Sequence, residues 1–184
     1  MKTLLTSCHT ETVVNRSKFL SFLVPYADFE GLQEKLKQEH PKANHVVYAL
    51  RYLNEFEQIV EQSTDDGEPK GCAGVPALNV LRGEELVNVA ILIVRYFGGI
   101  KLGTGGMARA YAQAVKDVLV HAELSAYEKR VEHTFTTDYS TIDRTLYRLK
   151  QYGIRDIERT YDVNKVIWKI TASEEKIRSW ESRG

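Results

Sequence analysis

The sequence lacks most of the features that would assign a protein to a specialised class. Its 184 residues include two cysteines, Cys8 and Cys72, which lie far apart and without Cys-x-x-Cys spacing. This argues against a disulfide framework and against a thiolate zinc site. The five histidines are scattered along the chain and form no closely spaced pair. We therefore expect neither a bound metal ion nor a cofactor.

Long apolar runs are also absent. The longest, Val87–Val94, has the length of a buried strand and falls far short of the roughly 18–20 residues that a membrane span needs. The N-terminal stretch has a single lysine and too short an apolar run for a signal peptide. We therefore expect a cytoplasmic protein with no membrane partner.

An excess of charge of one sign is missing as well. The chain has 25 Lys and Arg against 25 Asp and Glu, a formal net charge of zero, which excludes a protein held on nucleic acid by bulk charge alone. Neutrality is a cancellation, because residues 1–128 have 13 basic and 16 acidic side chains and residues 129–184 have 12 and 9. The first part is net −3 and the second net +3. The charge balance still allows contact with a polyanion. Because three net charges are few, an RNA site would have to be local, with a shape that fits the RNA.

Hydrophobic periodicity and turn signals divide the chain into two α+β domains, residues 1–126 and 127–184. In the first domain the apolar segment 86–97 is nearly continuous, which is typical of a strand covered on both faces. A helix is predicted over residues 107–122, where apolar side chains follow a 3.6-residue period. The other expected elements are an extended segment over 12–26, a helix between Asp28 and Pro41, a strand over His45–Leu53, an extended piece near 58–61 and a short helix over 75–81.

The second domain has the predicted order β-α-β-β-α, which is one strand short of a split β-α-β unit. The chain stops at Gly184, where the last strand would begin, so either the chain is truncated or the domain is naturally incomplete. The expected elements are strands over 131–137, 154–161 and 166–171, a helix after the capping-box sequence Ser140–Asp143 and a helix capped by Ser173.

A glycine-rich segment joins the apolar strand to the long helix of the first domain. Glycine permits positive φ and close approach of a ligand to the backbone, and a helix N-terminus favours an anion. The segment predicts a phosphate or nucleic-acid backbone site, although the glycines are equally consistent with a tight strand-to-helix crossing. Dinucleotide-binding and Walker fingerprints fit poorly. The candidate residues are Arg95, Tyr96, Gly98, Gly99, Lys101, Gly103, Thr104, Gly105, Gly106 and Arg109.

An acidic loop over residues 63–71 is the second candidate. Asp65, Asp66 and Glu68 fall within four residues and have the chemistry to hold a hard cation or to act as acid and base. Two alternatives stay open: a solvated turn, or carboxylates that pair with Arg51 or Arg95 and lock the loop to the sheet. No Ser-His-Asp or Cys-His arrangement supports a nucleophilic triad.

Aromatic residues accompany the cations in both domains. Arg95, Tyr96 and Phe97 end the apolar strand, and such groups neutralise phosphate and stack on bases. Because side chains alternate along a strand, Tyr96 should lie on one face and Arg95 and Phe97 on the other. We expect Phe97 in the core. Four tyrosines of the second domain are candidates for surface aromatics, with core or rim packing as the default expectation: Tyr139, Tyr147, Tyr152 and Tyr161.

Ordered sequence blocks over most of residues 17–122 resemble the IMPACT family, and more closely its bacterial members of the YigZ type. Met107 where a Leu is usual and Lys18 in place of Arg are mild departures. After residue 129 the resemblance rests on element order. The matching blocks are Ser17–Phe19, His45 in its strand, Ser63–Pro69, Gly71–Pro76, Val94–Gly103 and Gly105–Tyr111.

The resemblance implies a fold for each domain. The first would be ribosomal-protein S5 domain 2-like, and the second ferredoxin-like, similar to the final domain of elongation factor G. Eukaryotic relatives regulate translation under amino-acid stress through an additional domain that is absent here. No catalytic residue is established for the family, so the resemblance transfers a motif cluster, with His45, Asp65, Asp66 and Glu68 in it, and no active site.

We therefore expect a non-enzymatic, translation-linked regulator that binds RNA or ribosomal surfaces. One alternative is an enzyme acting on a small phosphorylated ligand, with Asp65, Asp66 and Glu68 holding Mg²⁺ near the glycine-rich segment. Another is a module that docks a protein partner. The sequence leaves the oligomeric state open.

Overall fold

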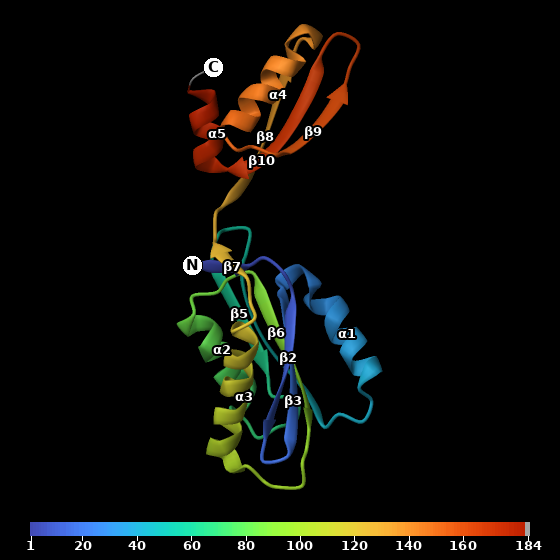
Figure 1. Ribbon diagram of the computed structural model, residues 1–184, viewed down its shortest axis with the longest axis vertical. Helices are drawn as coiled ribbons and strands as arrows, with labels where there is room; N and C mark the ends of the chain where they lie inside the picture. The colour runs from blue at the N-terminus through green and yellow to red at the C-terminus, as the bar shows by residue number, and fades with distance from the viewer. Residues whose placement is uncertain (183–184) are drawn as a thin grey trace. The chain divides into compact units, whose positions relative to one another are not determined.

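The computed structural model describes residues 1–182, which form two compact units. The first comprises Met1–Tyr127 and the second begins at Glu128, one residue from the boundary that the sequence predicted. The protein is of the α+β class, with three separate sheets (Figure 1). In the first unit a two-stranded sheet pairs β1 (Lys2–Leu4) with β7 (Leu124–Ala126), which ties the end of the unit to its beginning.

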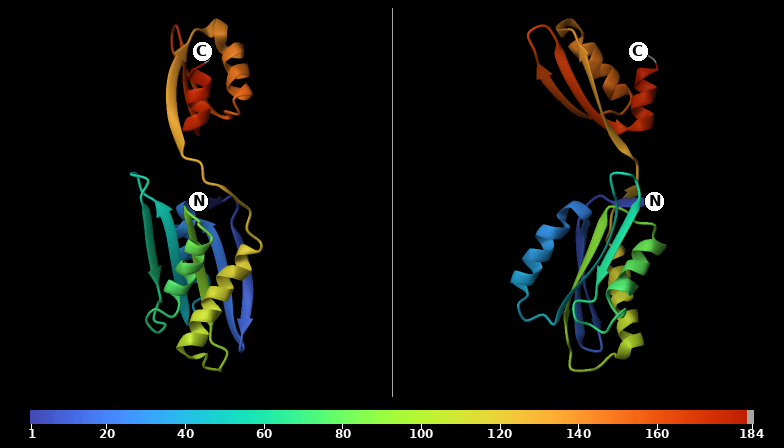
Figure 2. Two further views of the ribbon diagram at one scale, coloured as in Figure 1. Left: turned by 90° about the vertical axis from the view of Figure 1, so that its left-hand side faces the viewer. Right: turned by 180° about the vertical axis from the view of Figure 1, so that it is seen from behind.

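The main sheet of the first unit has five antiparallel strands in the order β2-β3-β6-β4-β5. Helix α1 covers one face of this sheet, and α2 and α3 cover the other (Figure 2). The strands are β2 (Cys8–Val14), β3 (Ser17–Pro25), β4 (His45–Leu53), β5 (Ile59–Thr64) and β6 (Val89–Tyr96), and the helices are α1 (Phe29–Glu39), α2 (Gly74–Gly83) and α3 (Gly103–Leu119).

Strand β6 lies at the centre of the sheet, and its apolar run is buried on both faces, as the sequence predicted. Ile91 and Ile93 pack in the cluster under α2 and α3, whereas Leu92 and Val94 pack under α1. The alternation continues past the apolar run. Arg95 therefore points to the α3 side of the sheet, a placement on which the candidate site depends.

The predicted glycine loop is shorter than expected, because α3 begins at Gly103 and not at Met107. Gly103, Gly105 and Gly106 are thus part of the first helical turn, and the connecting segment is only residues 97–102. Glycine has low intrinsic helix propensity, but tertiary packing overrides that preference. Burial of Met107 and Tyr111 against the core supplies the packing.

Gly98 is required by a close approach of two backbones. A Cβ at this position would lie 2.0 Å from the carbonyl carbon of Arg16, in the turn between β2 and β3. Asn15 and Arg16 themselves have positive φ, so this turn has little freedom to move away. The glycine therefore fixes the segment that follows β6 against the β2–β3 turn.

The second unit has the predicted β-α-β-β-α order, with antiparallel strands arranged β8-β10-β9. Its core contains the fully buried Trp168. Neither predicted helix start has a side-chain cap: Thr141, not Ser140, is the N-cap of α4, and Ser173 of α5 makes no capping bond. The elements are β8 (Arg130–Thr137), α4 (Ile142–Gln151), β9 (Asp156–Tyr161), β10 (Val166–Ser173) and α5 (Glu174–Glu181).

Residues 183 and 184, where the sequence placed the beginning of a missing strand, lie outside the described residues. Within residues 1–182 no helix is both long and apolar enough to cross a membrane.

We expect Gly98→Ala to lower the free energy of unfolding by about 3 kcal/mol or more, because the new methyl group has to displace backbone. Gly31→Ala is the matched control. Its Cβ would meet nothing within 4 Å, and alanine is preferred over glycine in a helix by up to about 1 kcal/mol. Chemical denaturation followed by circular dichroism measures both. Equal stability of the two variants would contradict the close approach.

Candidate functional site

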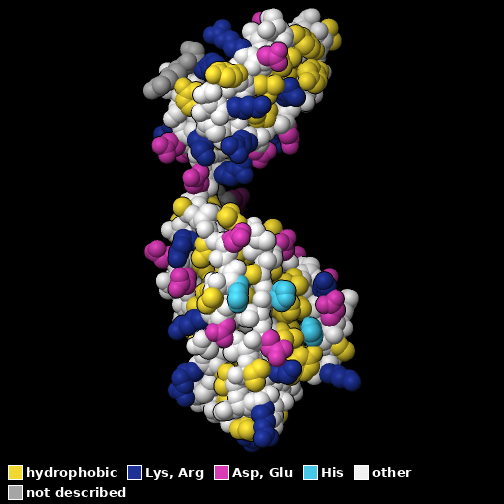
Figure 3. Space-filling view, viewed as in Figure 1, with side chains coloured by type: hydrophobic (Ala, Val, Ile, Leu, Met, Phe, Trp, Pro, Cys, Tyr) yellow, Lys and Arg dark blue, Asp and Glu magenta, His cyan; other side chains and the backbone are white. Residues whose placement is uncertain are grey.

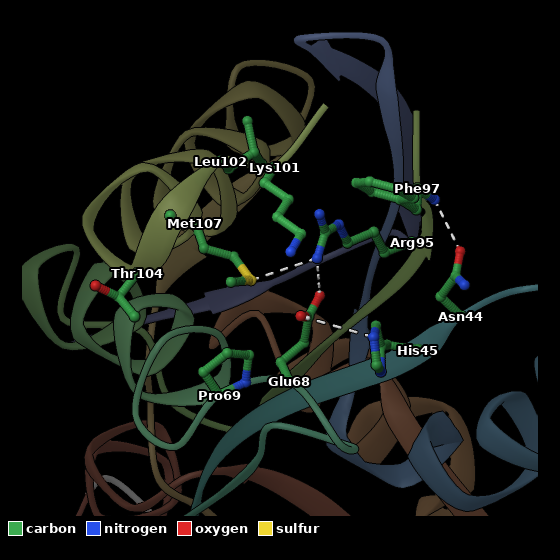
Figure 4. A pocket seen from close by; sticks show the side chains of 11 residues that line it. Asn44, His45, Glu68, Pro69, Arg95, Phe97, Lys101, Leu102, Thr104 and Met107 are labelled. Carbon is green, nitrogen blue, oxygen red and sulfur yellow. Dashed lines mark hydrogen bonds and ion pairs between the residues drawn. The ribbon is translucent and has the colours of Figure 1, made fainter. Parts of the chain in front are cut away.

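A cleft of about 390 Å³ brings the acidic loop and the glycine-rich segment together in the first unit (Figure 4). It opens between the beginning of β4, the end of β6, the loop before α2 and the N-terminus of α3. The two candidate segments therefore share one cleft, in which Glu68 and Arg95 meet across 27 residues of sequence. The lining residues are Asn44, His45, Glu68, Pro69, Arg95, Phe97, Lys101, Leu102, Gly103, Thr104 and Met107.

A buried ion pair forms the floor of the cleft. The Nη1 of Arg95 donates to the Oε1 of Glu68, and Arg95 and Glu68 are only 5% and 8% exposed. The hydroxyl of Tyr111, on α3, donates to the same carboxylate oxygen at 2.8 Å. Burial, followed by the negative charge of Glu68, raises the pKa of Tyr111 far above its usual range, so the phenol stays protonated as a donor.

The alternative in which a carboxylate of the loop pairs with Arg95 is thus confirmed. Arg51 does not take part, because it pairs with Glu61 at 2.8 Å. A buried pair has to make up for the loss of hydration of both charges. Here Tyr111 supplies the extra hydrogen bond that the carboxylate requires.

Arg95 has one donor that no described residue satisfies. Its Nε is buried without a hydrogen-bond partner among the described residues, and Nη1 also lies 3.3 Å from the Sδ of Met107. Figure 4 shows the Lys101 side chain extending toward the Arg95 guanidinium, and both residues line the cleft. Two cations therefore face this space with one buried carboxylate, Glu68, to balance them.

Asp65 and Asp66 are committed to the backbone and do not line the cleft. The Asp65 carboxylate accepts hydrogen bonds from the backbone N–H groups of Gly71, Ala73 and Gly74 at 2.7, 3.0 and 2.9 Å, which caps the beginning of α2. Asp66 accepts from the N–H of Val46 at 2.6 Å. The interpretation of these carboxylates as cation ligands is wrong. Within residues 1–182, no three His, Cys, Asp or Glu side chains are grouped to hold a metal ion.

His45 lies at the edge of the ion pair. Its Nδ1 is 2.7 Å from the backbone oxygen of Asp66. Because a carbonyl only accepts, Nδ1 carries the proton and donates. The Nε2 faces the second oxygen of Glu68 at 3.6 Å, and the ring borders the cleft. His45 therefore connects the loop, the strand and the buried carboxylate.

The N-terminus of α3 opens onto the cleft with no side chain capping it. Its first N–H groups, on Gly103 and Thr104, have no partner within the helix, and the helix dipole favours negative charge there. Lys101, which is exposed, lies two residues before the helix. Phe97 borders the same space and is 47% exposed. The arrangement offers donors for a phosphate beside an aromatic ring.

The expectation of a buried Phe97 is therefore wrong. The backbone N–H of Phe97 donates to the Oδ1 of Asn44 at 2.8 Å, which turns the chain out of the sheet at this point. Tyr96 lies on the α1 face, as alternation predicted, with its hydroxyl 2.8 Å from the Nδ1 of His40. Tyr96 therefore does not belong to the cleft.

Arg109 also lies elsewhere than predicted. It borders a groove between α2 and α3, together with Ala108, Ala112 and Lys116, and not the cleft. Gly98, Gly99, Gly105 and Gly106 shape the backbone and do not line the cleft. Sequence reasoning missed the contributions of Asn44, Leu102, Met107 and Tyr111, for which no local pattern signals a role.

Comparisons with known proteins agree with the sequence blocks. A family model described as the Impact N-terminal domain matches residues 15–119. An "IMPACT family member" from Haemophilus influenzae is 32% identical over 84% of this chain and 76% of its own length. "IMPACT family member YvyE" from Bacillus subtilis is 34% identical over 83% of this chain and 72% of its own.

The fold recurs in a crystal structure of a hypothetical protein. It aligns with 99% of this chain and 89% of its own, with a TM-score of 0.67 and 24% sequence identity. The likeness supports the fold alone.

We expect the single substitutions Arg95→Met and Glu68→Leu each to destabilise the protein by about 3–5 kcal/mol, because each leaves one buried charge without its partner. The double variant should cost clearly less than the sum of the two. Denaturant unfolding of all three variants measures the coupling. Glu11→Ala, in an exposed pair with Lys18, is the control and should cost at most about 1 kcal/mol. Additive effects at positions 95 and 68 would contradict a coupled buried pair.

Proposed function

Because the chain belongs to the IMPACT family, we propose that it is a non-enzymatic, translation-linked protein that binds RNA, at the ribosome or free. In this proposal the cleft of the first unit receives one nucleotide of the RNA strand. A phosphate lies at the N-terminus of α3 beside Lys101, and a base stacks on Phe97.

One observation carries this proposal: Lys101 and the uncapped N-terminus of α3 border the same cleft as the exposed ring of Phe97. Helix N-termini and lysines hold phosphate. Aromatic rings stack on bases with little regard to sequence. A chain of zero net charge cannot bind RNA by bulk attraction, so it needs a local site of this kind.

The topology of the two units supports the fold names that the family resemblance implies. In the second unit the strand order β8-β10-β9, with α4 and α5 as connections, is that of a ferredoxin-like unit without its last strand. For the first unit we propose the S5 domain 2-like fold on the same grounds of resemblance. Both folds suit a protein that faces the ribosome, although fold alone assigns no function.

The enzymatic alternative loses its main support. It requires Asp65, Asp66 and Glu68 to hold Mg²⁺ together, and each is already bonded to a different protein partner. Phosphoryl transfer depends on metal ions that bridge the phosphates. RNA binding, in contrast, is compatible with carboxylates that are all bonded within the protein.

We expect Lys101→Ala to weaken binding of a fluorescein-labelled oligouridylate several-fold and to lower the slope of log affinity against log salt by about 0.7. Fluorescence anisotropy between about 50 and about 200 mM salt measures both quantities. Lys37→Ala is the matched control, because Lys37 is an exposed lysine on α1, on the opposite face of the sheet. An equal loss of affinity in both variants, or no binding by the wild type at low salt, would contradict the proposal.

We expect Phe97→Ala to weaken the same binding by about 1–3 kcal/mol, the usual contribution of one base–aromatic stack, without a change of salt slope. Phe97→Tyr keeps a ring at the position and should bind like the wild type. An equal loss in the two variants would show that stacking plays no part.

A further inference from the structure

The ion pairs of the second unit lie outside α4. In the described part of the unit, ion pairs join residues of the sheet, of α5 and of the segment that enters the unit, and none of these pairs includes a residue of α4. The pairs are Arg130 with Asp156, His133 with Glu181, Lys169 with Glu132, Lys176 with Glu128 and Arg178 with Glu174. Five carboxylates of the unit are thereby paired with cations outside α4.

Helix α4 presents cations without carboxylate partners. Arg144 and Lys150 are exposed, and no carboxylate within residues 1–182 lies at ion-pair distance from either. Arg148 lies over the ring of Trp180 at 5.8 Å and donates to its backbone oxygen, so its charge is also not neutralised. Asp143 is the one acidic residue of the helix. The helix therefore carries a local positive charge.

An exposed aromatic lies between these cations. Tyr147 is 65% exposed, so the expectation that it packs in the core or rim is wrong. Arg144, Tyr147 and Lys150 follow each other at intervals of three residues, which places them along one slanting row of the helix surface. The two cations are about 9 Å apart along the axis, with the ring between them. In Figure 3, Lys and Arg side chains lie beside hydrophobic ones over this part of the unit.

We propose that the outer face of α4 is a second RNA-binding surface, in which Arg144 and Lys150 contact phosphates and Tyr147 stacks on an unpaired base. A flexible single strand brings its backbone and its bases to one such row of side chains. This surface extends the proposed function, since the ligand class is the same. It rests on separate observations in a separate unit.

The open face of the sheet lacks the chemistry for this role. Its outward side chains on β8 and β10 are threonines, Ser173, Ile167 and charged residues of ion pairs, with no aromatic ring. Sheet-based RNA readers stack bases on aromatic side chains of the strands. In this unit the exposed ring between two cations is on the helix side.

A membrane surface is a poorer match for α4. Helices that lie on membranes insert a broad apolar face. The apolar residues Ile142, Leu146 and Leu149 instead pack against the core of the unit. The exposed side of α4 offers no aliphatic side chain for insertion.

Anisotropy titrations of the full-length protein with labelled oligouridylate test this surface. The double variant Arg144→Ala/Lys150→Ala should weaken binding about tenfold and lower the salt slope by about 1.4, as loss of two phosphate contacts requires. Tyr147→Ala should weaken binding about tenfold, and Tyr147→Phe should not. The matched control Arg130→Ala/Lys169→Ala removes the same charge from two cations of the sheet that are paired. Circular dichroism of each variant confirms that it is folded.

The outcomes separate this surface from the cleft. An equal loss of affinity in the control and in the α4 double variant would overturn the proposed α4 surface, because bulk charge would then explain binding. If Lys101→Ala weakens binding and the α4 variants do not, the result would support the cleft as the RNA site and overturn the α4 surface. Loss with the α4 variants and none with Lys101→Ala would support the surface and overturn the cleft. Binding of phosphatidylserine vesicles, with no binding of oligouridylate, would overturn both.

Discussion

The buried pair between Arg95 and Glu68 is the interaction on which the candidate site depends. Arg95 comes from the central strand β6, Glu68 from the loop before α2, and the hydroxyl that completes the carboxylate from Tyr111 of α3. Charges removed from water stabilise a fold only when their hydrogen bonds are met. These three elements therefore have to meet in one arrangement, and the space they leave is the cleft (Figure 4).

The three carboxylates of the acidic loop hold the site together through bonds within the protein. Asp65 caps the beginning of α2, Asp66 bonds to the beginning of β4, and Glu68 pairs with Arg95. With these carboxylates committed, the groups that remain at the cleft are Lys101, the uncapped α3 N-terminus and Phe97. In the proposed function, the acidic loop supplies structural support and the segment before α3 supplies the groups that contact RNA.

Local patterns predicted the elements well, because β6 is apolar on both faces and α3 repeats at the helical period. They failed where long-range packing decides the outcome. Gly103 and its neighbours begin a helix, since burial of Met107 outweighs the low propensity of glycine. Which carboxylate meets Arg95 depends on contacts over 27 residues of sequence. The exposure of Phe97 and Tyr147 likewise follows from how neighbouring elements end and pack.

An NMR titration tests most directly whether the cleft of the first unit binds RNA, as we propose. Oligouridylate is added to the ¹⁵N-labelled full-length protein at low salt, and the amide signals are followed residue by residue. The account predicts the largest shifts at Lys101, Gly103 and Thr104, with signals around Phe97 moving in the same concentration range. Shifts that leave these amides unchanged while others move, or no shifts at all, would contradict it.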